Sequence, residues 1–363
     1  MMKLKIIDKY LIKQFISTLF FALISFTLIF VILDMMENLD DFIDESVNSN
    51  IVLQYYIVFI PEIIRLILPI SILLATLFTS GKMANLNELT AFKAGGISLY
   101  RFMLPFLIVT FFISLINIYF SGYIVPHANK HKVFIEQTYM KKGLVHFGSN
   151  IFFQDTKTRI VTINFYDISL GQANQVSIQD FDSFDKTKIV SRTDCERMIY
   201  DTTKHSWIAL NGSTRIFNDS TEYLENFSTK EFNNLHFSPD DVIKKQRKPE
   251  ELTLTELDEF IKEQIRTGNI STKLEIAYHS RIAYAFSSII VVLFGLPISA
   301  NKRKSGLALQ FGINMLVTFL YLFFMKISQA FGENGILPPI ITAWTANFIF
   351  LIAAVVNIKY AMK

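Results

Sequence analysis

The sequence predicts an α-helical membrane protein with six transmembrane helices, three on each side of an inserted extracytoplasmic all-β domain of jelly-roll type. Apolar residues make up 51% of the 363 and charged residues only 18%, which is unlike a soluble protein. Six sparsely charged apolar runs are long enough to cross a bilayer, which takes about 20 residues. The middle of the chain, from about 126 to 268, has no such run and contains short β-rich stretches instead.

The composition excludes several other classes of protein. The apolar fraction excludes an intrinsically disordered chain, and the 14 glycines show no collagen-like period. The lone cysteine, Cys195, can form no intrachain disulfide. The formal charge of +3 provides no broad basic surface for phosphates, so we expect no nucleic acid as a partner.

The predicted spans divide the chain into four regions. The spans are residues 11–33, 51–78, 102–125, 276–298, 307–328 and 340–358. The regions are 1–125 with three spans, 126–250 with the β domain, 251–275 with a linker helix, and 276–363 with the other three spans. The first span is too long for the core of a signal peptide and lacks a small-residue cleavage site after it, so we expect it to be retained.

Basic residues in the short loops predict the orientation, because cytoplasmic loops carry an excess of Lys and Arg. Lys9, Lys82 and Arg303 fall on one side if the helices alternate. The short loops of the other side carry acidic residues such as Asp34 and Glu333, without Lys or Arg. We therefore expect both termini in the cytoplasm and the β domain outside it.

The β domain is predicted from short strands and turn residues. Stretches at 159–166, 188–191, 206–210 and 213–217 favour strands, and residues such as Asn211 and Gly212 favour turns between them. Short strands at this spacing indicate a sandwich or a jelly roll.

The linker after the β domain is predicted to be an amphipathic helix. A capping box at 255–258 would open it, and Gly268 would end it. Its apolar face consists of Leu257, Phe260, Ile261 and Ile265. This face can pack on the β domain, which we favour, or lie at the membrane surface.

The sequence contains no motif of an enzyme. It lacks a G-x-x-x-x-G-K-[ST] loop, so any ATP must be handled by a partner, and it lacks G-x-S-x-G, H-E-x-x-H and Cys/His clusters. His127 and His131 have the spacing of a metal-binding pair on a helix, but no third ligand is evident nearby. We predict no catalytic residue, no metal site and no directly bound cofactor.

Four ionisable residues lie well inside the predicted spans: Glu62, Arg65, Arg281 and Lys326. Such residues are costly in a bilayer and are functional candidates by default. Glu62 and Arg65 are three residues apart on one helix and most simply pair with each other. An ion-coupled secondary transporter usually has carboxylates and broken helices near the bilayer midplane, and the third and sixth spans carry no charge. The sequence gives this alternative little support.

A short helix is predicted between the second and third spans. The segment is too polar for membrane, and its helix-forming sequence ends at Gly-Gly at 95–96. Leu86, Leu89 and Phe92 would form a stripe, with Glu88 on another face. The segment is either an interfacial helix or a coupling helix that inserts into a cytoplasmic motor.

This segment resembles a motif of the LptF/LptG (YjgP/YjgQ) lipopolysaccharide export permeases. Residues 87–96, Asn-Glu-Leu-Thr-Ala-Phe-Lys-Ala-Gly-Gly, are similar to the family's S-E-L-x-x-x-x-A-x-G segment, with Asn87 in place of the usual Ser. Ile-Val-Pro at 124–126, and Gly-Ile-Leu-Pro-Pro at 335–339 before Ala-Trp at 343–344, resemble other landmarks of the family. The three-plus-three layout is similar across essentially the whole chain.

The resemblance implies a subunit of an ATP-driven extractor of lipopolysaccharide. In this family two paralogous permeases form a heterodimer over a dimeric ABC-type cytoplasmic ATPase, LptB, and LptC adds a membrane helix and another jelly roll. Lipopolysaccharide enters between the permeases from the outer leaflet of the bacterial inner membrane, and ATP-driven closure pushes it into the periplasmic β domains. Asp-Lys-Tyr at 8–10 and the Gly-x-x-Pro-Pro loop favour an LptG-like chain with an LptF-like partner.

The resemblance also implies roles for particular residues. Glu88 matches the glutamate of the family's coupling helix, which docks into the ATPase, and Leu86, Leu89 and Phe92 accompany it. A solvated surface glutamate is the alternative. The outer halves of the first and fifth spans would form a cavity wall for acyl chains, although plain lipid-facing or helix-packing positions would look identical; these residues are Phe26, Phe30, Leu33, Leu320, Phe323 and Phe324.

One feature departs from the family. LptG relatives commonly place basic residues just outside the first span, where they meet lipid phosphates, whereas residues 34–41 contain no cation. Either the phosphate contacts come from elsewhere, with Arg65 and Lys326 as candidates, or the transported lipid has a less phosphorylated head group.

A β domain that carries acyl chains needs an apolar inner face. Strand alternation puts Val161, Ile163 and Phe165 on the favoured inner face and residues 160, 162 and 164 on the other. A membrane-anchored assembly protein that uses the β domain only for docking remains an alternative, because one fold serves several functions.

Overall fold

The computed structural model describes residues 5–140, 142, 151–167, 170–218, 221–239, 241–242, 248–267, 271–300 and 307–361. The chain divides into two compact units. The membrane unit comprises Met1–Ile135, Thr253–Asp258 and Thr272–Lys363, and the β unit comprises Glu136–Leu252 and Glu259–Ser271.

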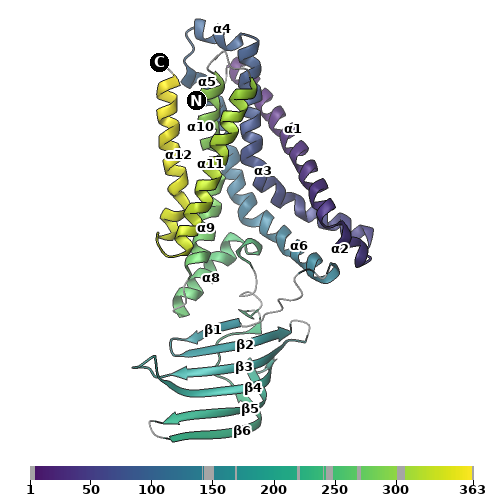
Figure 1. Cartoon of the computed structure of the whole chain (residues 1–363), viewed down its shortest axis with the longest axis vertical. Helices are drawn as coiled ribbons and strands as arrows, with labels where there is room; N and C mark the ends of the chain where they lie inside the picture. Colours follow the sequence, from purple (N-terminus) through teal and green to yellow (C-terminus); the bar gives the residue numbers. More distant parts are fainter. Residues whose placement is uncertain are drawn as a thin grey trace. The chain divides into compact units, whose positions relative to one another are not determined.

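The membrane unit contains the predicted spans. Among the described residues six helices are long and apolar enough to cross a membrane, which confirms that prediction. Its elements in chain order are α1 (Ile6–Glu37), α2 (Leu39–Asp44), α3 (Ser49–Asn85), α4 (Glu88–Ala94), α5 (Leu99–Tyr119), a π-helical turn (Phe120–Ile124), α6 (Val125–Tyr139), α9 (Thr272–Ala285), α10 (Ser287–Ala300), α11 (Leu307–Glu333) and α12 (Pro339–Ala361) (Figure 1).

Two helices are much longer than a membrane is thick. α3 has 37 residues, and the continuous helix Leu99–Tyr139 has 41. At 1.5 Å per residue they measure about 55 and about 60 Å, whereas the hydrocarbon core is about 30 Å thick. The hydropathy of the sequence therefore predicted only the apolar, membrane-spanning part of each helix and missed its polar continuation. The α6 segment continues as a helix beyond the apolar part.

The fourth span is interrupted, which the sequence did not predict. α9 ends at Ala285 and α10 begins at Ser287, without a Gly or Pro at the break. Asn347 of α12 donates a hydrogen bond from Nδ2 to the Ala283 carbonyl at 2.9 Å, and the Tyr321 hydroxyl of α11 donates to Asn347 Oδ1. Because lipid supplies no such partners, a break of this kind is tolerated only inside protein.

The packing puts the fourth span at the centre and the first at the margin. In the most apolar stretch of each span, 61% of residues are buried in the fourth and only 11% in the first. The main core lies where α1, α3, α5 and α10 meet, and its buried members include Leu11, Phe15, Ile72, Phe106 and Leu296.

Small residues let neighbouring helices approach closely. A Cβ atom built on Gly295 of α10 would lie 3.2 Å from Thr76 Cγ2 of α3. The buried hydroxyl groups of Ser80 and Ser299 lie 2.5 Å apart across the same interface. In lipid, where apolar burial does not drive helix association, such close packing and hydrogen bonding hold helices together.

The β unit contains an antiparallel sheet, which confirms the predicted all-β insertion. The described strands follow chain order as a meander, a simpler order than the Greek-key crossovers of a jelly roll. They are β1 (Ile151–Thr156), β2 (Arg159–Asp167), β3 (Gln172–Phe181), β4 (Ile189–Asp201), β5 (Ser206–Asn218) and β6 (Thr221–Phe232).

The strand boundaries correct the sequence prediction. Three strands, β1, β3 and β6, were missed, and the polar residues that fill β3 and β6 explain two of these omissions. The predicted turn at Asn211 and Gly212 is wrong, because both lie inside β5. A Cβ atom on Gly212 would lie 2.8 Å from Cys195 Cβ and 2.6 Å from Phe227 Cζ, so this glycine marks a close approach within the sheet.

The buried face of β2 is also predicted only in part. Val161 and Ile163 are fully buried as expected, but Phe165 is 40% exposed and Tyr166 is buried in its place. The neighbouring strand explains the shift, because Gln175 of β3 has a left-handed backbone with φ 52° opposite this point. A single left-handed residue breaks the two-residue alternation, so the inner-face assignment of Phe165 is wrong.

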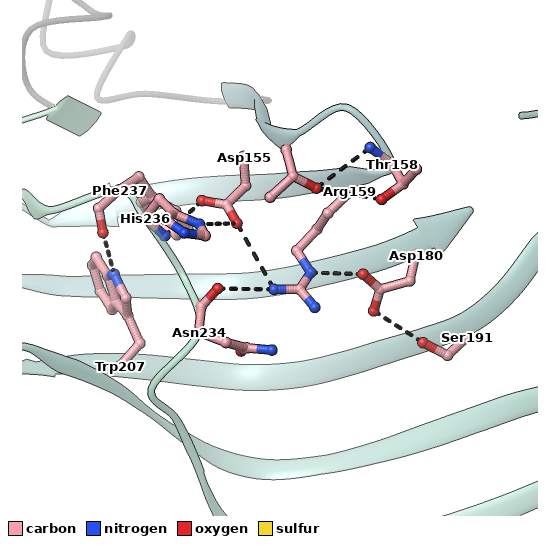
Figure 2. A network of polar contacts seen from close by, with 10 residues as sticks. Asp155, Thr158, Arg159, Asp180, Ser191, Trp207, Asn234, His236 and Phe237 are labelled. Carbon is pink, nitrogen blue, oxygen red and sulfur yellow. Dashed lines mark hydrogen bonds and ion pairs between the residues drawn. The ribbon is translucent and has the colours of Figure 1, made fainter. Parts of the chain in front are cut away.

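The segment after β6 is pinned to the first strands by a polar network (Figure 2). Asp155 accepts a hydrogen bond from the His236 backbone N–H at 2.7 Å. Arg159 donates to the Asn234 carbonyl at 3.0 Å and to Asp180 Oδ1 at 2.6 Å. These contacts hold the returning chain against β1 and β2, and Arg159 also ties β2 to β3.

Aromatic contacts complete this covering of the sheet. Trp207 Nε1 donates to the Phe237 carbonyl at 2.8 Å, and the two ring centroids lie 5.1 Å apart. Phe237 and Val242 join the buried cluster of the sheet. The returning segment therefore covers the apolar face.

The helix that follows the sheet, α8 (Leu254–Thr267), begins two positions earlier than predicted. Thr253 and Glu256 form the capping box, since the Glu256 N–H donates to Thr253 Oγ1 and the Thr253 N–H to Glu256 Oε2. Leu257 and Ile261 are buried, whereas Ile265 is 59% exposed. The predicted cap at 255–258 is therefore wrong, because the cap lies two residues earlier.

The contact between α11 and α12 gives a test of close helix packing. A Cβ atom on Gly332 would lie 2.8 Å from Cβ of Thr342, which is 1% exposed and cannot move aside. We expect Gly332→Ala to destabilise the protein by roughly 1–3 kcal/mol. Gly312→Ala on the same helix is the matched control, because nothing lies within 4 Å of that position. Thermal unfolding in detergent would measure both, and equal midpoints would contradict the packing.

Cys195 gives a test of the sheet interior. Burial raises its pKa to about 12, and the neighbouring Asp194 charge adds to this effect. We expect the folded protein to resist maleimide at pH 8 and to react after denaturation, with a cysteine placed at the 99% exposed Phe184 as the positive control.

The same thiol sets a pH dependence. Between about pH 9 and about pH 12 the unfolded chain loses this proton while the folded chain keeps it. The contribution of Cys195 to stability is therefore present below this window and is lost as the pH rises through it. Rapid labelling of the folded protein at pH 8 would contradict the burial.

Candidate functional site

The predicted coupling segment forms a separate short helix, α4. It lies at the end of the membrane unit where α1 begins and α12 ends (Figure 1). Asn87 before it and Gly96 after it have left-handed backbones, with φ 59° and 76°. These two turns separate α4 from α3 and α5.

Two of the three residues of the predicted apolar stripe lie together on the inward side of α4. Leu89 is 5% exposed and Phe92 packs beside it against the main core. Leu86 is 58% exposed and lies at the end of α3, outside α4, so its place in the stripe is wrong. The chain direction changes at Asn87, which the helical periodicity of the sequence does not show.

Glu88 is the first residue of α4 and is half-buried. Its Oε2 accepts a hydrogen bond from the Tyr10 hydroxyl of α1 at 3.4 Å. The described exposed residues of α4 include Thr90, Ala91 and Ala94. A carboxylate at this position can accept a cation or a hydrogen-bond donor from a partner.

The residues predicted to line a lipid cavity lie on two separate surfaces. On α1, Phe30 and Leu33 are 45% and 51% exposed, and Phe26 is half-buried. On α11, Phe323 is 52% exposed; Leu320 and Phe324 are 39% and 44% exposed. α1 packs on α3 and α5, whereas α11 packs on α12, α9, α10 and α3. Each surface is open to lipid or to another protein.

Arg65 is engaged within its own helix. It forms a salt bridge with Glu62, to which both Nε and Nη2 donate, and Asn129 of α6 donates to the same carboxylate at 3.3 Å. The pairing predicted from the sequence is therefore present. Because two of its nitrogens are occupied, Arg65 is a poorer candidate for binding phosphate than the sequence suggested. Lys326, the other candidate, is exposed on α11.

α6 carries a basic face that the sequence pattern did not predict. The side of α6 that packs on α3 carries Asn129 and Lys132, whose ammonium lies 4.4 Å from the centre of the Phe59 ring. The opposite side exposes His127, Lys130 and His131, spaced i, i+3 and i+4. The sequence had pointed to His127 and His131 as a pair on a helix, but Lys130 was not grouped with them.

His127 and His131 are not joined by a third metal ligand among the described residues. Among the described residues no group of three or more His, Cys, Asp and Glu side chains is placed to hold a metal ion. His127 Nδ1 lies 2.8 Å from the Tyr123 carbonyl, one turn earlier in the same helix. The pair is thus available for polar contacts on the exposed side of α6.

Comparison with known proteins gives a match along nearly the whole chain. Residues 9–360 match the family described as lipopolysaccharide export system permease LptF/LptG. The chain is 23% identical to the lipopolysaccharide export system permease protein LptF of Escherichia coli K12, over 97% of this chain and 94% of the relative. The LptF protein of Shigella flexneri gives the same identity and coverage.

Proposed function

The chain belongs to the LptF/LptG family of lipopolysaccharide export permeases, and we propose that it is one of two permease subunits in an ATP-driven extractor of lipopolysaccharide. It is a multi-pass protein of the inner membrane and a transport subunit of an ABC-type system. In the proposed cycle lipopolysaccharide leaves the outer leaflet and passes to the periplasmic β domains. The relatives reported above are LptF proteins, and the LptG-like character of this chain stays a prediction.

The observation that carries the motor assignment is α4 with Glu88. The helix lies where α1 begins and α12 ends, and Glu88 at its first position is half-buried. The sequence contains no phosphate-binding loop, so a partner must hydrolyse ATP. We assign this role to a dimeric LptB-like ATPase that receives Glu88. Both termini would then lie in the cytoplasm and the β unit in the periplasm.

The exposure of α1 supports a second permease as partner. Only 11% of its apolar stretch is buried, so the outer half of α1 has room for lipid or for a facing helix. In the proposed complex Phe30 and Leu33 face α11 of an LptF-like paralogue across the lipid cavity. Phe323 and Phe324 of this chain face α1 of the paralogue. Acyl chains would fill the gap, because burying them is worth roughly 0.8 kcal/mol per CH₂.

In the proposed function, residues of α6 bind the lipid phosphates in preference to Arg65. Lys130 and His131 are exposed, whereas Arg65 is occupied by Glu62. The two α6 residues lie in the polar continuation of the third span, just after its apolar part, where head groups would lie in the proposed orientation. Lys326 of α11 stays the second candidate.

The β unit would receive the acyl chains on its apolar face and pass them to an LptC-like protein. Val161, Ile163 and Tyr166 form part of that face. In the present structure Phe237 and Val242 cover it.

The first test of this function concerns the motor. We expect Glu88→Ala to weaken binding to the ATPase by about 10-fold or more, since a hydrogen bond to a charged group is worth roughly 1.5–3 kcal/mol. Co-purification from detergent and lipid release driven by ATP would measure this. Glu333→Ala is the control, because Glu333 is exposed at the far end of α11. Unchanged co-purification and lipid release in Glu88→Ala would refute the role of Glu88.

A second test concerns the phosphate contact. Replacing Lys130 and His131 together by Gln should weaken binding of lipopolysaccharide about 2- to 5-fold at low salt, as expected for exposed charge pairs. The effect should shrink at high salt, because ions screen exposed charges. Lys326→Gln is the comparison variant, and lipid A stripped of its phosphates is the control ligand. A larger loss from Lys326→Gln than from the α6 pair would move the phosphate site to α11.

A further inference from the structure

The position of α4 depends on its neighbours. The helix has seven residues, and a helix so short does not persist in water without tertiary contacts. Left-handed residues disconnect it from the long helices on both sides. Its inward side chains, Leu89 and Phe92, supply apolar contact, but apolar contact is non-directional and does not orient a carboxylate.

An ion pair joins the first turns of α1 and α5 beside α4. Asp8 Oδ2 accepts hydrogen bonds from Arg101 Nη2 at 2.7 Å and from the Lys5 backbone N–H at 2.9 Å. Asp8 is 2% exposed, so its charge depends on Arg101 for compensation. Only residues 95–98 separate α4 from α5. The pair therefore fixes the point at which α4 is attached.

A small hollow lies next to this ion pair. Its volume is about 80 Å³, and its lining includes Asp8, Leu11, Phe92, Ile97 and Arg101. Asp8 Oδ1 is buried and has no hydrogen-bond partner among the described residues. Packing between α4 and the helix ends is thus incomplete at this place. Since tight packing resists movement, the hollow leaves α4 room to shift.

Tyr10 adds the directional contact. It follows Asp8 by two residues on α1, and its hydroxyl donates to Glu88 Oε2. The same two turns of α1 therefore bind the start of α5 through Asp8 and the start of α4 through Tyr10.

We propose that Asp8, Tyr10 and Arg101 are positioning residues that form a latch, holding α4 against α1 and aiming the Glu88 carboxylate at the motor. The role in coupling rests on the proposed function. When the ATPase engages Glu88, the carboxylate exchanges the Tyr10 hydroxyl for a donor of the ATPase. Because α1 is one continuous helix from Ile6 to Glu37, this exchange also links the motor to the lipid-facing half of α1.

The latch is testable on the chain alone. A spin label on a cysteine at the exposed Thr90 position, with Cys195 replaced by Ser, reports the mobility of α4. Tyr10→Phe and Asp8→Asn should both increase this mobility in detergent. Tyr100→Phe is the matched control, because its ring is 53% exposed near the same helix ends. Equal mobility in Tyr10→Phe and the parent protein would overturn the latch.

The coupling role needs the ATPase. Tyr10→Phe should lower lipid-stimulated ATP hydrolysis about 2- to 10-fold, the factor that one hydrogen bond supports, while ATPase co-purification stays intact. Asp8→Arg alone should uncouple hydrolysis, and Asp8→Arg with Arg101→Asp should restore it. Wild-type coupling in Tyr10→Phe would refute the coupling role. An increased mobility of α4 in a protein that binds no ATPase would instead support the latch and refute the proposed function.

Discussion

The membrane unit depends on one constraint, which is that lipid offers no hydrogen-bond partner to a backbone group. The break between α9 and α10 is possible because Asn347 reaches the Ala283 carbonyl and is itself held by Tyr321. Tyr284 of α9 donates to the Leu66 carbonyl of α3 at 3.0 Å. Hydrogen bonds therefore tie the fourth span directly to α12 and α3, and α11 supports the α12 contact. These contacts explain why that span is the most buried of the six.

The close packing of α3 and α10 at the centre of the membrane unit leaves α1 at its edge. The surfaces of α3 and α10 that face each other are filled with small and hydroxyl-bearing residues, so the two helices form a rigid pair. α1 rests on this pair through one end of its length, around Leu11 and Phe15, and its other half is largely exposed. The far end of α1 is held as well, because Phe42 of the following α2 packs on Tyr55 of α3, with ring centroids 5.5 Å apart. The exposed stretch of α1 therefore lies between two anchored ends.

Sequence alone predicted the features that lipid enforces and missed those that specific neighbours create. The spans were found because a bilayer requires about 20 apolar residues wherever the chain crosses it. The break near Phe286 was missed because its stabilising partner, Asn347, is distant in sequence. Glu88 was singled out by a motif and stays a prediction, whereas Leu86 was misplaced because periodicity does not register the left-handed Asn87. The turn predicted at Gly212 failed for a similar reason, since a glycine can mark close packing as well as a turn.

Charge is distributed unevenly at the end of the membrane unit that carries α2 and α6. The exposed charges of α2 include Asp40 and Asp44, whereas the exposed side of α6 carries Lys130 and His131. At physiological salt such charges act over about 8 Å, so they orient a ligand locally more than they attract it from a distance. In the proposed function a phosphorylated lipid would turn its head group toward α6 and away from α2. The apolar half of α1, which precedes the acidic α2, would then contact acyl chains and not phosphates. The absence of basic residues after the first span is therefore compatible with a phosphorylated lipid, because Lys130 of α6 can supply the cation instead.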